Sequence, residues 1–167
     1  VDRYDKRIEE LSQRDAYREP VNQMTCFLVV NRPTALSVMV EIGDFMRFPS
    51  AEQFAAYLGI VPGEHSSSDS RNRLGITKAG NTHVRKLLVE SAQSYGRGKV
   101  GYKSKALIKR QEGNPAKVIA YADRANERLR RKYYQMILRG RHSNVAKTAV
   151  ARELACFMWG MMTGRID

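Results

Sequence analysis

Apolar residues in this chain recur at spacings of three and four, and this helical period constrains the fold more than any other feature of the sequence. It brings Val84, Leu87 and Leu88 onto one side of a single helix. The period predicts helices over 2–18, 20–28, 34–42, 51–58, 82–91, 116–139 and 143–161. The strand–helix–strand alternation of a parallel sheet does not occur. We therefore predict a mainly α fold, a helical bundle, in a chain of 167 residues.

Residues that suit helix caps mark several of the expected boundaries. Pro33 suits the first position of the helix over 34–42, because a proline there needs no N–H donor. Ser50 followed by Gln53 has the spacing of a capping box. Asn81 or Thr82 is expected to cap the helix over 82–91.

The helical period disappears between Val61 and Gly80, where a loop or a short β-hairpin is predicted to be inserted. This segment holds three serines followed by three cations: Ser66, Ser67, Ser68, Arg71, Arg73 and Lys78. A serine hydroxyl becomes a useful nucleophile when its proton is removed, and arginines can bind phosphate and stabilise the charge of a phosphoryl-transfer transition state. The residues alone leave two interpretations open, a site that attacks a phosphodiester and a flexible linker with solvated serines.

The charge is unevenly divided along a chain whose net charge is +12. Residues 1–70 hold 7 basic and 11 acidic side chains, whereas residues 71–167 hold 22 basic and 6 acidic ones. Lysine and arginine neutralise phosphates and release counterions, so the asymmetry favours a nucleic-acid partner over a merely solvated basic surface. No apolar run approaches the roughly 20 residues of a membrane helix, and no membrane partner is expected.

Metal and cofactor motifs are missing from the sequence. His65, His83 and His142 have no ligand spacing to one another or to a cysteine, so no metal site and no cofactor are predicted in this chain. Cys26 and Cys156 lie 130 positions apart without a secretory signal, which predicts reduced thiols and a cytoplasmic protein.

Several segments follow, in order, the pattern of a known family. They are Glu41-Ile42-Gly43-Asp44, Tyr57-Leu58-Gly59-Ile60-Val61-Pro62, Glu64-His65-Ser66-Ser67, Gly75-Ile76-Thr77-Lys78-Ala79-Gly80-Asn81, Arg85-Lys86-Leu87-Leu88 and Val150-Ala151-Arg152-Glu153-Leu154. Residues 22–160 resemble the C-terminal transposase domain of the DEDD-type insertion-sequence transposases, relatives of the Piv and MooV DNA invertases. The ordered set is more specific than any single segment.

The resemblance implies a division of the protein into domains. Residues 1–19 would be the end of a coiled-coil linker helix, and residues 20–167 the DNA-recombination domain, with a helix-hairpin-helix-like beginning. The family's N-terminal RuvC-like domain, which binds Mg²⁺ through acidic residues, is expected to be absent from this chain. The family also implies homo-oligomers of the full-length protein, and some of its members are guided to their sites by a structured bridge RNA.

The resemblance further implies a serine nucleophile that forms a covalent phosphoserine link to DNA. By position in the family's Ser-Ser-Gly motif this residue is Ser67, with Ser66 beside it. Ser68 stands where the family has glycine, so the register stays open among the three serines. Val30-Asn31-Arg32-Pro33 likewise replaces the family's Gly-rich hairpin.

Basic and polar residues around the serines are the expected nucleic-acid contacts. Phosphate near the nucleophile would be held by Arg71, Arg73 and Lys78, and the backbone positioned by Asn81, Arg85 and Lys86. A second basic face on the long helix would comprise Arg124, Arg128, Arg131 and Lys132, with a solvated helix surface as its alternative. Two rival functions remain, a non-catalytic nucleic-acid-binding module and an assembly module of the transposase.

Overall fold

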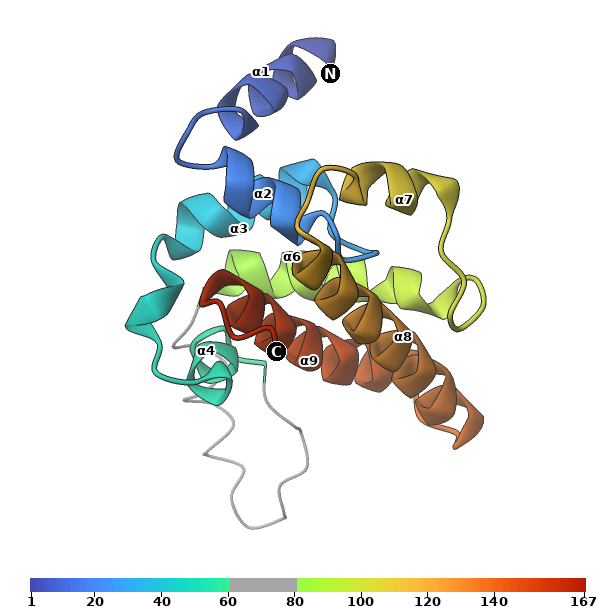
Figure 1. The fold of residues 1–167 in the computed structure, drawn as a ribbon. Helices are drawn as coiled ribbons and strands as arrows, with labels where there is room; N and C mark the ends of the chain where they lie inside the picture. Colours follow the sequence, from blue (N-terminus) through green and yellow to red (C-terminus); the bar gives the residue numbers. More distant parts are fainter. Residues whose placement is uncertain (61–80) are drawn as a thin grey trace.

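The computed structural model describes residues 1–60 and 81–167. These two ranges are mainly helical and contain no strand, so the predicted mainly α class is confirmed (Figure 1). The helices are α1 (Asp2–Ser12), α2 (Arg18–Met24), α3 (Arg32–Ile42), η1 (Phe45–Arg47), α4 (Ala51–Tyr57), α6 (Thr82–Ala92), η3 (Gln93–Gly96), α7 (Lys105–Gln111), α8 (Ala116–Leu138) and α9 (Ser143–Met162). The predicted loop or hairpin insertion lies outside the described residues.

The helix predicted over 2–18 is shorter in the structure, because residues 13–17 are not helical. α1 ends at Ser12, whose hydroxyl bonds back to the carbonyl oxygen of Glu9 at 2.8 Å. α2 begins at Arg18, and Pro20 lies in its first turn, where no N–H donor is required. The helix predicted over 20–28 is therefore wrong at both ends, because α2 starts two residues earlier and stops at Met24.

α2 ends early because a residue far away in the sequence bonds the carbonyl oxygens that follow it. Arg110, on α7, donates from Nε to the carbonyl oxygen of Thr25 at 3.1 Å. It also donates from Nη2 to the carbonyl oxygens of Phe27 and Leu28, at 3.0 and 2.9 Å. One guanidinium thus satisfies three acceptors that a continuing helix would have bonded internally.

The connection between α2 and α3 stands where a helix-hairpin-helix-like turn is expected, and it offers few free N–H groups to a phosphate. Its backbone N–H groups at residues 25–28 and 30 are all bonded inside the protein. The Asn31 side chain accepts a hydrogen bond from the N–H of Thr34 at 2.9 Å and so caps α3. Pro33 is consequently the second residue of α3, because the helix already begins at Arg32.

The remaining short helices follow the caps that the sequence indicates. Ser50 accepts a hydrogen bond from the N–H of Gln53 at 3.1 Å and begins α4. Asn81, rather than Thr82, caps α6. α7 was not predicted, although Ser104 caps it by accepting from the N–H of Leu107 at 3.2 Å.

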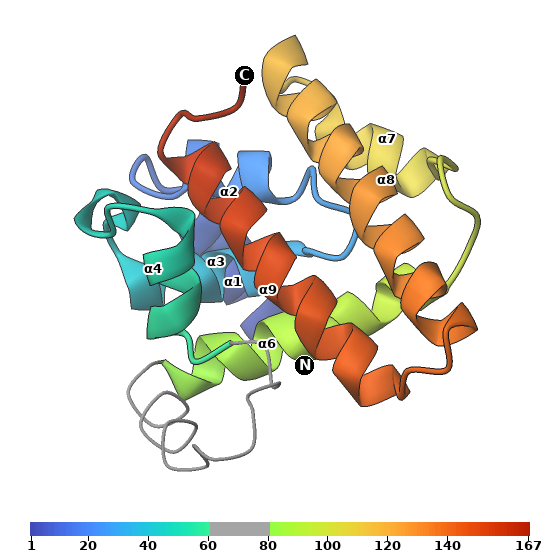
Figure 2. The same cartoon turned by 90° about the horizontal axis from the view of Figure 1, so that it is seen from below.

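α9 runs through the middle of the molecule and organises the core. It contacts α2, α4, α6 and α8, and Figure 2 shows α4 and α8 on opposite sides of it. Small side chains such as Ala151 and Ala155 are fully buried on α9, which allows the neighbouring helices to approach closely. Met158 and Trp159 are buried there as well, and Trp159 donates from Nε1 to the carbonyl oxygen of Phe48 at 3.1 Å.

None of the helices in residues 1–60 and 81–167 is both long enough and apolar enough to cross a membrane.

Candidate nucleic-acid interface

The serine segment is attached to the core at both of its described ends. Ile60 is buried, and its N–H bonds to the carbonyl oxygen of Ala55 at 3.1 Å. On the other side of the segment, α6 begins at its cap, Asn81. Because α4 and α6 both pack on α9, the two attachment points share one platform (Figure 2). The candidate residues within the segment fall outside the described residues: Ser66, Ser67, Ser68, Arg71, Arg73 and Lys78.

The start of α6 places three of the candidate residues in two turns of helix. The Asn81 side-chain oxygen accepts a hydrogen bond from the N–H of Val84 at 3.0 Å, so this residue holds the helix end in place. Lys86 is exposed and Arg85 is half-buried. A helix N-terminus favours anions through its N–H groups and its dipole, and the charge of Lys86 acts in the same sense.

A cross-link between α3 and α6 braces this helix start. His83 Nδ1 contacts the Glu41 carboxylate. The hydrogen bond from His83 is the main reason that the pKa of Glu41 lies below its usual value, despite the opposing effect of burial. Glu41 is therefore ionised at neutral pH. No group of three or more metal-ligating side chains occurs among the described residues.

The predicted basic face of α8 exists as an open furrow of about 570 Å³. It lies along the helix and extends to Arg139, just beyond the last helical residue. Its charged lining residues are Arg124, Glu127, Arg128, Arg131, Lys132 and Arg139. The structure thus brings Arg124, Arg128, Arg131 and Lys132 together on one side of α8, as their spacing predicts.

Two of these cations also connect α8 to α9. Glu153 on α9 accepts from Arg128 Nε through Oε1 and from Lys132 Nζ through Oε2, both at 2.5 Å. Burial raises the pKa of Glu153, but the hydrogen bonds from Lys132 and Arg128 outweigh burial and hold this pKa below its usual value. The carboxylate is therefore charged and bonded on both oxygens.

The other two cations of the predicted face have weaker attachments. Arg131 pairs with Glu127 one turn earlier at 2.6 Å, with both side chains more than half exposed. Arg124 donates to the carbonyl oxygen of Ile166 at 3.2 Å. An exposed ion pair such as Arg131–Glu127 contributes about 0–1 kcal/mol to stability, so Arg131 can be recruited by an anion at little cost.

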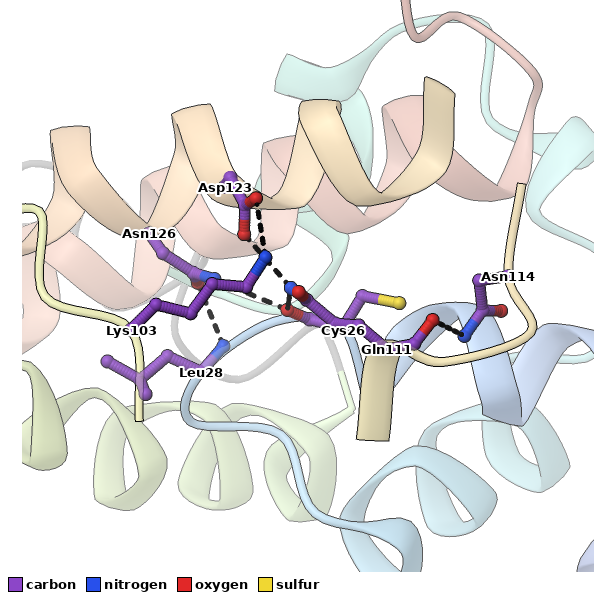
Figure 3. Close-up of polar contacts among 7 residues, drawn as sticks. All are labelled: Cys26, Leu28, Lys103, Gln111, Asn114, Asp123 and Asn126. Atoms are coloured by element: carbon purple, nitrogen blue, oxygen red, sulfur yellow. Dashed lines mark hydrogen bonds and ion pairs between the residues drawn. The ribbon is translucent and has the colours of Figure 1, made fainter. Parts of the chain in front are cut away.

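A partly buried polar cluster, which sequence reasoning missed, links α7 and α8 to the connection after α2 (Figure 3). Gln111 and Asn126 both donate to the carbonyl oxygen of Cys26, at 3.1 and 3.2 Å. Asp123 accepts from Gln111 at 3.0 Å and from Lys103 at 2.8 Å. The only signal in the sequence was the presence of polar residues at positions that the helical period assigns to the buried side of α8.

The two cysteines are free thiols, as predicted. Burial raises the pKa of Cys26 to about 11, and burial also raises the pKa of Cys156. Because the thiolate is the reactive form, neither cysteine is suited to nucleophilic chemistry at neutral pH.

Residues 29–107 match the model of the family described as Transposase IS116/IS110/IS902 family. The range runs from the α2–α3 connection into α7, and this part of the chain is similar to the transposase domain of that family.

Individual relatives agree with this assignment. A Sinorhizobium fredii protein, y4qE, which its name describes as a transposase, is 44% identical over 128 residues, covering 76% of this chain and 32% of that protein. The transposase for insertion sequence element IS1111A of Coxiella burnetii is 36% identical over 114 residues, covering 65% of this chain and 31% of the relative. The transposase for IS1328 of Yersinia enterocolitica is 27% identical over 154 residues, which are 92% of this chain and 39% of the relative.

The chain spans about a third of the length of these relatives. No solved structure matches it.

Proposed function

We propose that this chain is the DNA-recombination domain of an insertion-sequence transposase, with a serine of the 61–80 segment as its nucleophile. The observation that carries the proposal is the match of residues 29–107 to the transposase family, because this range includes the serines and the start of α6. The attachment of both ends of the segment to the α9 platform supports it further, since a nucleophile must be presented in a defined place.

The proposed reaction is attack of the Ser67 hydroxyl oxygen on the phosphorus of a DNA phosphodiester. The serine hydroxyl loses its proton as the serine–phosphate ester forms, the bond from phosphorus to one deoxyribose oxygen breaks, and that oxygen takes up a proton to become a free hydroxyl. After strand exchange, the hydroxyl of the incoming strand attacks the ester and returns the serine. Ser66 and Ser68 are the alternative nucleophiles.

The surrounding cations have two roles in the proposal. Arg71, Arg73 and Lys78 neutralise the reacting phosphate and the charge that develops on it. Arg85 and Lys86 bind neighbouring phosphates at the start of α6, which fixes the position of the DNA and carries no sequence information. Asn81 contributes by holding the helix end, because its side-chain oxygen is engaged by the N–H of Val84.

The proposal assigns residues 20–167 to this domain and residues 1–19 to the end of a coiled-coil linker. An acidic, Mg²⁺-binding RuvC-like domain would lie in another part of the transposase and would be needed for strand joining. Association into homo-oligomers and guidance by a bridge RNA would likewise belong to the complete protein, in the cytoplasm.

A covalent trap tests the serine chemistry. The transposase that contains this chain is incubated with Mg²⁺ and a donor DNA nicked close to the cleavage position, so that the freed strand diffuses away. We expect DNA to remain attached to the protein after denaturation, and mass spectrometry of the linked peptide to identify Ser67.

The matched control is Ser70→Ala, in the same segment but outside the three-serine run. Ser67→Ala should abolish the covalent product while Ser70→Ala retains it. Normal transposition by all three single variants, Ser66→Ala, Ser67→Ala and Ser68→Ala, would instead identify a non-catalytic module and refute the proposed chemistry.

A further inference from the structure

The α8 furrow has the length and charge of a binding site for a polyanion. Five cations line it: Arg124, Arg128, Arg131, Lys132 and Arg139. From the first to the last, a helical rise of 1.5 Å per residue gives a line of charge about 22 Å long. One strand of B-DNA presents a phosphate about every 3.4 Å along its axis but also winds around that axis, so a straight line of this length can contact several neighbouring phosphates of one strand.

Glu153 changes the charge that this furrow offers to a ligand. Its two carboxylate oxygens bond Arg128 and Lys132, one each, from a position on α9 where its own side chain is only 18% exposed. Arg128 remains 66% exposed and contacts Glu153 only through Nε. The other N–H donors of its guanidinium are therefore accessible to a ligand. The carboxylate therefore takes the place that a phosphate oxygen would take between two cations.

The geometry points to a second DNA-binding surface: the α8 furrow holds one strand of a DNA duplex by its phosphates, and Glu153 weakens that binding by competing for Arg128 and Lys132. The inference rests on the proposed function, since it takes DNA as the partner. Figure 2 shows α8 and the beginning of α6 on different sides of α9, so the furrow is separate from the start of α6. The furrow binds phosphates, so its affinity is independent of base sequence.

Two sets of variants test the furrow with effects of opposite sign. Arg131→Gln combined with Arg139→Gln removes two exposed cations that take no part in the Glu153 interaction. Glu153→Gln removes the competing charge. Lys105→Gln combined with Lys109→Gln is the matched control, because it removes two exposed charges from α7, outside the furrow.

The measurement is the dissociation constant of the 167-residue chain for a fluorescein-labelled duplex of arbitrary sequence, by anisotropy over a series of salt concentrations. The furrow double variant should bind about tenfold more weakly, and its salt dependence should fall by about two units of slope, one for each phosphate that is no longer neutralised. Glu153→Gln should bind about threefold more tightly, and the α7 double variant should lose much less affinity than the furrow variant. Circular dichroism verifies that each variant is folded.

Equal losses for the furrow and α7 variants would overturn the furrow assignment while leaving the chain a DNA-binding domain. Weaker binding by Glu153→Gln would overturn the competitor role. The same titrations with an RNA duplex form a third arm, in which a furrow-dependent loss for RNA but not for DNA would overturn the choice of DNA as partner. The proposed serine chemistry is judged separately by the covalent trap, whose product does not depend on these affinities.

Discussion

The side chain of Asn126 and the backbone of Leu28, 98 residues apart in the sequence, are joined by a hydrogen bond of 2.8 Å in which Leu28 N–H is the donor. The same amide oxygen accepts from the Tyr95 hydroxyl at 3.1 Å, and its nitrogen donates to the carbonyl oxygen of Cys26. One buried amide therefore fixes the connection between α2 and α3 against α8.

Asn126→Ala is expected to lower the free energy of unfolding by about 2–4 kcal/mol, because it leaves a buried backbone donor and other buried polar groups without this partner. Urea denaturation followed by circular dichroism measures the change. The control is Asn144→Ala at an exposed position near the start of α9, which should change stability by less than about 0.5 kcal/mol. Similar small losses for both variants would contradict the structural role of Asn126.

Gly160→Ala should destabilise the chain although alanine is the better helix former. A Cβ atom at position 160 would lie 2.3 Å from the hydroxyl oxygen of Tyr121, whose hydroxyl donates to the carbonyl oxygen of Phe157 at 2.8 Å. We expect a loss of about 1–3 kcal/mol, typical of overpacking in a filled core.

A double-mutant cycle isolates this clash. In the Tyr121→Phe background the clashing oxygen is gone, so the additional cost of Gly160→Ala should fall clearly below its cost in the wild-type chain. Thermal or urea unfolding of the four proteins provides the comparison. An unchanged cost in both backgrounds would mean that the Tyr121 hydroxyl is not what excludes a side chain at Gly160.

Glu153→Gln should cost about 1 kcal/mol of stability at pH 7, a value kept small because Arg128 is largely exposed. The pKa of Glu153 lies below its usual value in the folded chain, so its contribution is complete above that usual value and is lost as pH falls through the folded pKa. Urea unfolding of wild type and variant from pH 7 down to acid measures this, and the difference between the two should shrink below about pH 4.5. A difference that stays constant on acidification would argue against a charged Glu153 between Arg128 and Lys132.

The two cysteines should react at different rates with iodoacetamide. Cys26 is fully buried and burial raises its pKa to about 11, whereas Cys156 is half-buried. In the native chain Cys156 should therefore be alkylated first, and Cys26 should react only after unfolding. Peptide mapping by mass spectrometry measures both rates, with a denatured sample as the control in which the two become similar. Faster labelling of Cys26 in the native chain would disagree with this packing.

A structural feature could be predicted from the sequence when the residues that produce it lie close together in the chain. The caps at Ser50 and Asn81 lie within three residues of the N–H groups that they accept from, so the sequence displays both partners together. The basic face of α8 was visible for the same reason, since helical spacing alone brings Arg124, Arg128 and Arg131 to one side. The serine segment could be singled out from its residue types alone, because serines and cations occur together in it. The role of Ser67 remains a prediction.

By itself, the sequence determined the helical class, most of the helices and the cations on α8, because these follow from side-chain periodicity over a few turns of helix. Tertiary structure alone decided where α2 ends, since Arg110 bonds carbonyl oxygens more than 80 residues away in the chain. It also decided that Glu153 pairs with both Arg128 and Lys132 on a neighbouring helix. Such interactions depend on how whole helices pack around α9, and no short stretch of sequence contains both partners.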